Sequence, residues 1–203
     1  MVVKVTAMRD KLFKTVTAIL VLVFAFGLAA CSTDPQESSP TGSTSVARTQ
    51  NEEHTGRRVY FAAPLFSESE REYNLHIVNI LESYGYEVFL PQRDGFLAPE
   101  LEGLTEEEKI QKIFEKDKEE VLNSDILFMV LDGRIPDEGA CVELGIAYAN
   151  GIRCYGYKSD ARSVELDMDL NPMITGCLIH LFYNLNGEQL EAELEEYLQN
   201  NTL

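Results

Sequence analysis

Residues 132–149 read DGRIPDEGACVELGIAYA, and they follow a short apolar run, ILFMVL, at 126–131. The run is typical of a buried strand, and the stretch after it is typical of a polar turn that leads into a helix. Open α/β sheets bind ligands beyond the carboxyl ends of their strands, which is where this stretch lies. Because a helix dipole stabilises a carboxylate near its start, we expect Glu143, the acid within this helix, to stay charged and available as a nucleophile or ion partner. A capping and solubilising surface acid is the alternative.

Apolar runs and helix signals alternate along the rest of the chain. The other predicted strands are 59–63, 86–90, 152–156 and 179–183, and the other predicted helices are 68–84, 105–122, a short one from Pro172, and 188–199. Residues 92–104 and 158–170 are predicted to be polar loops. Strands that alternate with helices indicate a parallel sheet covered on both faces. We therefore expect one α/β domain over 57–203, a flavodoxin-like doubly wound sandwich with a mainly parallel five-stranded sheet and helices on both faces.

The first 31 residues have the pattern of a secretory signal. Four basic residues precede the apolar run 16–28, which is short for a membrane-spanning helix. The run ends in Leu-Ala-Ala-Cys31, which resembles the lipobox of bacterial lipoproteins. We therefore expect lipidation of Cys31, an extracytoplasmic location and anchoring to a bacterial membrane. A plain signal peptide with a chance cysteine is the alternative. Residues 32–56, rich in Ser, Thr and Pro, are predicted to be a disordered tether.

Composition narrows the classes of partner. The net charge is -17, and such an acidic protein repels phosphate backbones, so nucleic acid is not an expected partner. The four cysteines form no CxxC pair and have no histidine at metal-ligand spacing, so neither a metal site nor a disulfide framework is predicted.

Several short motifs, in order, resemble the nucleoside 2-deoxyribosyltransferase family over residues 59–178. They are YFAAPLF at 60–66 with SESER at 67–71, FLPQRD at 89–94, Asp117 with SD at 124–125, DEGACVELGIA at 137–147, and DAR at 160–162 with NPM at 171–173. The resemblance implies a flavodoxin-like fold and the transfer of 2-deoxyribose between nucleobases through a covalent sugar–enzyme intermediate. It also implies a deoxynucleoside and a free nucleobase as partners, no cofactor, and a homo-oligomer.

The resemblance also assigns roles by position. Glu143 matches the nucleophile, and Tyr60 matches the tyrosine that orients it. Asp117 and Asp137 match the aspartates that face the base and handle its proton, and Asn171 matches the residue that contacts the sugar. Phe66 and Asp94, in the loop motifs, join Asp117 and Asn171 as candidate substrate-binding residues. The simpler alternatives are a core tyrosine at 60, a solvated acid at 117 and a helix N-cap at 171.

The expected chemistry needs two carboxyl groups, as retaining glycoside hydrolysis does. Glu143 would attack C1′, and Asp137 is the candidate that moves the proton of the base. A hydrolase of deoxynucleosides or deoxynucleotides with the same glutamate is one alternative, and a non-catalytic nucleoside-binding lipoprotein is another. The loop at 63–71 has one arginine and no glycine, which favours an uncharged nucleoside over a 5′-monophosphate.

Overall fold

The computed structural model describes residues 56–162 and 168–203. The predicted signal at 1–31, the lipid site at Cys31 and all of the predicted tether except Gly56 lie outside these ranges. Within the described ranges, no helix combines the length and apolar character needed to cross a membrane.

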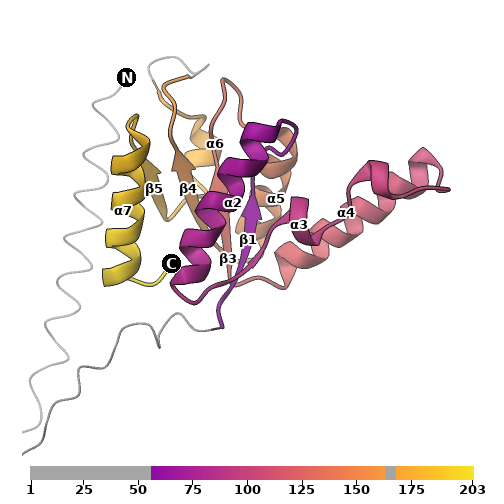
Figure 1. The fold of residues 1–203 in the computed structure, drawn as a ribbon, viewed down its shortest axis with the longest axis horizontal. Coiled ribbons are helices and arrows are strands. Elements are labelled where there is room, and N and C mark those ends of the chain that lie inside the picture. Colours follow the sequence, from indigo (N-terminus) through magenta and orange to yellow (C-terminus); the bar gives the residue numbers. More distant parts are fainter. Residues whose placement is uncertain (1–55, 163–167) are drawn as a thin grey trace, which may run out of the picture. The chain divides into compact units, whose positions relative to one another are not determined.

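Five strands form the centre of the fold, in the order β2-β1-β3-β4-β5 (Figure 1). They are β1 (Arg58–Ala62), β2 (Glu87–Phe89), β3 (Ile126–Val130), β4 (Arg153–Lys158) and β5 (His180–Tyr183). Each adjacent pair is parallel. The predicted α/β doubly wound fold is therefore confirmed, and its switch point lies between β1 and β3, where ligand crevices form in such sheets.

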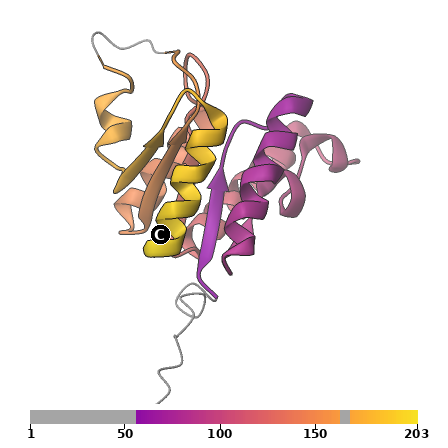
Figure 2. The ribbon, with the colours of Figure 1, turned by 60° about the vertical axis from the view of Figure 1, so that its left-hand side comes forward.

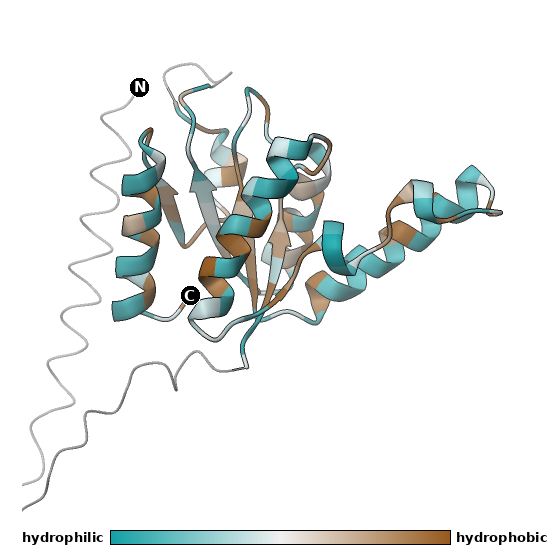
Figure 3. Cartoon of the chain, in the orientation of Figure 1, coloured by the Kyte–Doolittle hydropathy of each residue, from teal (hydrophilic) through white to brown (hydrophobic). Residues whose placement is uncertain are grey.

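Helices cover both faces of the sheet (Figure 2). The helices α2 (Glu68–Ser83) and α7 (Gly187–Asn200) pack on one face, and α4 (Glu106–Leu122), α5 (Glu138–Ala149) and the short α6 (Pro172–Thr175) lie on the other. Because side chains alternate along a strand, Phe61 faces α2 and α7 whereas Tyr60 faces α4 and α5. Apolar residues gather on the strands and on the helix faces that meet them (Figure 3).

Two predicted loops differ from the structure. Residues 92–104 contain most of α3 (Pro91–Asp94) and a 3-10 turn, η2 (Ala98–Glu100), because Pro91 starts a helical turn and the Asp94 carboxylate accepts the Leu90 N–H at 2.9 Å. The predicted loop 158–170 begins inside β4, which continues to Lys158 because Lys158 pairs with Tyr183 of β5. The Lys158 side chain is only 1% exposed.

The apolar face of α4 is covered in part only. Val121 is buried, but the side chains of Ile110 and Phe114 are 62% and 51% exposed. The first half of α4 extends beyond the edge of the sheet, so this chain offers it little to pack against (Figure 1).

Gly156 allows the segment after α6 to pack closely on β4. A Cβ at this position would lie 2.7 to 2.9 Å from the terminal methyl carbons of Leu178, Leu131 and Leu181. We expect Gly156→Ala to lower the free energy of unfolding by about 1–3 kcal/mol because it overpacks a buried site. Urea unfolding measures this, with Gly145→Ala as the control because a Cβ there meets no atom within 4 Å. An unchanged midpoint for Gly156→Ala would contradict the close packing.

Candidate active site

Tyr60 and Glu143 meet in a direct hydrogen bond. The Tyr60 hydroxyl donates to Glu143 Oε1 at 2.8 Å. Tyr60 is fully buried on the central strand β1, and Glu143 is in the second turn of α5 rather than in its first. Asp137 caps that helix, since its Oδ2 accepts the Ala140 N–H at 2.8 Å. The strand and the capped helix thus fix both partners, and they give the carboxylate one defined orientation.

The Glu143 carboxyl does not have the stable charge expected from the helix dipole alone. Burial raises its pKa to about 7, against the lowering effect of the hydrogen bond from Tyr60, and the charges of Asp117 and Asp137 raise it further. The same burial, with the charges of Glu143 and Asp117, raises the pKa of Tyr60, so the tyrosine remains a donor. Near neutral pH, Glu143 is therefore divided between its protonated and ionised forms.

Asp117 is a second perturbed carboxyl beside Glu143. It is on α4 and half-buried, so the alternative of an ordinary solvated acid does not hold. Burial raises its pKa to about 6, Lys116 lowers it, and Glu120 raises it. A carboxylic acid that is still partly protonated at about pH 6 is suited to general acid catalysis.

Asp117 and Glu143 line one groove between α4 and α5, with a volume of about 380 Å³. The other lining residues are mostly apolar: Ile110, Ile113, Phe114, Lys118, Gly139, Val142 and Ile146. The groove therefore offers an apolar surface for a flat ring next to two carboxyl groups, which is the usual composition of a small-molecule site.

A layer beneath the site was not predicted from the sequence. The ring of Phe89 stacks on Tyr60, with centroids 5.6 Å apart, and Lys116 Nζ lies 5.5 Å from the centroid of Phe89. Glu120 binds Lys116 at 2.6 Å and also pairs with Arg58. Phe89 stood in a predicted strand and Glu120 in a predicted acidic helix, so only their three-dimensional placement distinguishes them from ordinary core and surface residues.

Three other predicted site residues do not line the groove that holds Glu143. Asn171 caps α6 through the Met173 N–H at 2.9 Å, which confirms the N-cap alternative. Asp94 accepts from Leu90 and Arg93, and Phe66 is 77% exposed in the loop after β1. Among the described residues, the lining of the α4–α5 groove does not include these three side chains. Their roles toward a substrate remain predictions.

Comparison with known proteins decides the family. The model of the family described as nucleoside 2-deoxyribosyltransferase matches residues 59–200. The chain belongs to the nucleoside 2-deoxyribosyltransferase family. This membership indicates an enzyme of the nucleoside deoxyribosyltransferase or N-glycosidase type, with nucleosides and nucleobases as its class of substrates.

Solved structures resemble the described fold of this family member. A 2-deoxyribosyltransferase from Bacillus psychrosaccharolyticus is 26% identical, with a TM-score of 0.55 over 69% of this chain and 91% of that one. A conserved protein from Enterococcus faecalis V583 is also 26% identical, with a TM-score of 0.55 over 70% of this chain and 97% of that one. No curated protein gives a significant match.

Proposed function

We propose that this protein transfers 2-deoxyribose between the nucleobases of 2′-deoxyribonucleosides through a deoxyribosyl ester of Glu143. The observation that carries the proposal is the hydrogen bond from Tyr60 to Glu143 in a groove shared with Asp117. An ionised Glu143 oxygen bonds to C1′ as the bond between C1′ and the base nitrogen breaks, and the leaving base takes a proton. An incoming base reverses these steps, loses its proton and leaves Glu143 as a free carboxylate.

There are two candidate proton donors: Asp117, which lines the groove, and Asp137, the N-cap of α5, which is not among the lining residues. Asp137 was the predicted donor, but its Oδ2 is engaged in capping α5. Asp117 has a pKa raised to about 6, so it holds a proton at a pH where part of Glu143 is ionised. We therefore assign proton delivery to Asp117 and leave Asp137 to face the base, with Asn171 to contact the sugar.

Incubation with deoxynucleosides tests the proposal. The protein is incubated with thymidine with and without adenine, and deoxyadenosine and free deoxyribose are measured by chromatography. Formation of deoxyadenosine supports transfer. Free deoxyribose at equal rates in both incubations would instead support hydrolysis, and binding of thymidine without any product would support the non-catalytic alternative. Repeating the assay with thymidine 5′-monophosphate tests the predicted preference for the uncharged nucleoside.

The Tyr60 hydroxyl gives a separate prediction. We expect Tyr60→Phe to lower kcat about tenfold, since a hydrogen bond to a charged group contributes about 1.5–3 kcal/mol. Its loss also removes a contact that lowers the pKa of Glu143, so the optimum of the pH–rate profile moves to higher pH. Tyr73→Phe is the matched control, because that hydroxyl donates to Tyr157 on the other face of the sheet. Equal profiles for the two variants would contradict the role of Tyr60.

We also propose that a second copy of the chain covers the α4–α5 groove. Ile110, Phe114 and Val142 line the groove, and each is more than half exposed. A second copy packed on them would remove water from the surroundings of Glu143, which strengthens electrostatic interactions there.

A charge on this surface tests the oligomer. We expect Phe114→Glu to dissociate the oligomer and to lower kcat, whereas Leu75→Glu, at an exposed position of α2 on the opposite layer, should change neither. Sedimentation velocity measures the mass of the parent protein and of both variants. A parent protein that sediments as a monomer would refute the shared groove.

The proposed location is extracytoplasmic, with Cys31 lipidated and anchored to a bacterial membrane. The sequence pattern at 16–31 supports this. Expression in bacteria with and without Cys31→Ser tests it, because only the lipidated protein should remain with the membrane fraction.

A further inference from the structure

Two aspartates cross-link the loops that follow the neighbouring strands β3 and β4. Asp132 follows β3 and accepts from the backbone N–H of Ser159 at 2.6 Å and from the Ser159 hydroxyl. Asp160 follows β4 and accepts in return from the Gly133 N–H at 2.8 Å. We call Asp132 and Asp160 the crossed aspartate pair. The carboxylate of each loop thus accepts hydrogen bonds from the other loop.

The Asp160 carboxylate is held by two cations as well. Lys158 Nζ donates to Asp160 Oδ1 at 3.0 Å and to the Arg162 carbonyl oxygen at 3.1 Å. The Arg162 guanidinium donates to Asp160 Oδ2, its Nε at 2.8 Å. A buried ammonium without a partner is strongly destabilising, so the burial of Lys158 depends on Asp160. These bonds fix the position of the Asp160 carboxylate.

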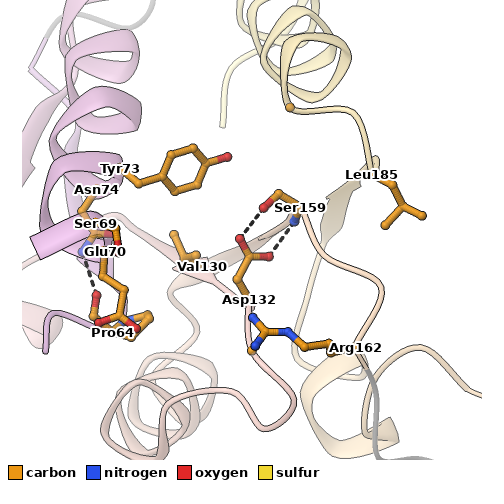
Figure 4. Close-up of a pocket in the computed structure, with 12 residues that line it drawn as sticks. Pro64, Ser69, Glu70, Tyr73, Asn74, Val130, Asp132, Ser159, Arg162 and Leu185 are labelled. Atoms are coloured by element: carbon orange, nitrogen blue, oxygen red, sulfur yellow. Dashed lines mark hydrogen bonds between the residues drawn. The ribbon is translucent and has the colours of Figure 1, made fainter. Parts of the chain in front are cut away.

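The backbone at Gly133 is shaped to reach this carboxylate. Gly133 has φ of 112°, a conformation that side chains with a Cβ rarely adopt, and a Cβ there would lie 3.0 Å from the Ile135 carbonyl oxygen. Asp132, Gly133, Ser159 and Arg162 line a cleft of about 630 Å³ on the side of α2, where Figure 4 shows Asp132 facing Ser159. This cleft is separate from the α4–α5 groove that holds Glu143.

One of the cross-linked loops leads directly to a predicted site residue. The loop after β3 ends at Asp137, the N-cap of the helix that carries Glu143. We propose that the crossed aspartate pair is a positioning device that holds Asp137 in place for the reaction. The inference rests on the proposed function for its kinetic part, and neither aspartate of the pair contacts the substrate in it.

The tested variant is Asp160→Asn, with Asp125→Asn as the matched control. Asp125 makes the same kind of bond at the other end of the strands, where β1 and β3 begin: its Oδ2 accepts the Arg58 N–H at 2.9 Å. We expect Asp160→Asn to speed hydrogen exchange in peptides that cover 133–143 and to lower kcat at least about tenfold, since small misplacements of reacting groups are costly. Asp125→Asn should leave that exchange unchanged and kcat within about twofold of the parent. If Asp160→Asn does not fold, Gly133→Ala serves as the second variant with the same expectations.

The outcomes separate this inference from the proposed function. Unchanged exchange over 133–143 in the variant refutes the cross-link, and faster exchange with the kcat of the Asp125→Asn control refutes its positioning role. A loss of thermal stability equal to that of the control, combined with a selective loss of kcat, supports the inference. If the parent protein forms no product, the proposed function and the positioning role both fail, and exchange alone decides whether the cross-link exists.

Discussion

We expect Glu143→Gln to lower kcat for base exchange by about 10³-fold or more, as removal of a covalent nucleophile does in other enzymes. Glutamine has nearly the same shape and still offers an oxygen to the Tyr60 hydroxyl, which donates at 2.8 Å. The variant therefore changes the chemistry more than the packing. Mass spectrometry of protein quenched during turnover should show a deoxyribosyl adduct on the parent protein and none on the variant. An adduct on the variant, or turnover near that of the parent, would refute the nucleophile.

The same variant should be more stable than the parent at alkaline pH. Burial raises the pKa of Glu143 from its ordinary value of 4.5 to about 7 in the folded protein. Below pH 4.5 the carboxyl is protonated in both the folded and unfolded states, so its titration does not change the free energy of unfolding. As the pH rises from 4.5 to 7, the carboxyl ionises in the unfolded state but largely keeps its proton in the folded state, so by pH 7 the folded parent loses about 3 kcal/mol that Glu143→Gln retains. Urea unfolding at pH 4.5 and pH 8 measures this, with the exposed Glu196→Gln as the control. An equal difference between parent and Glu143→Gln at both pH values would contradict the raised pKa.

The sequence predicted the order of the elements and the partners at the centre of the site. Continuous apolar runs such as that of β3 can be recognised because strands buried on both faces carry few polar residues. Tyr60 and Glu143 were predicted as partners because their motifs resemble the family, and the structure joins them directly. That hydrogen bond supports their pairing, while their catalytic roles stay proposals.

Features that depend on distant contacts could not be predicted in the same way. Lys158 was assigned to a polar loop because a lysine is rarely buried, and only its partner Asp160 makes that burial possible. The pKa of Glu143 was expected from the dipole of its own helix, whereas burial against β1 and the acid on α4 determine it. Similarly, helical spacing cannot indicate that Ile110 and Phe114 stay exposed, because that depends on how far α4 extends past the sheet.

Asp117→Asn should lower kcat/KM by about 10²- to 10³-fold, within the range of general acid catalysis, and change the pH profile. The reactive form needs Glu143 ionised and Asp117 protonated. With pKa values of about 7 and about 6, this form is a minority that is most populated between them, so the parent protein should show a bell-shaped dependence of kcat/KM. Because the two groups interact, the apparent pKa of each limb is a property of the pair and not of one residue. Asparagine cannot titrate, so the alkaline limb should disappear and kcat/KM should rise to a plateau as Glu143 ionises.

Asp137→Asn decides between the two candidate donors. Asparagine is as good an N-cap as aspartate, so α5 and the position of Glu143 should be preserved. If Asp117 delivers the proton, Asp137→Asn retains both limbs of the bell, and its loss of kcat/KM reflects weaker contact with the base. If Asp137 delivers it, the alkaline limb disappears in Asp137→Asn and persists in Asp117→Asn. The contrast between the two profiles is independent of the size of either loss, because it depends only on which residue must hold a proton when the base leaves.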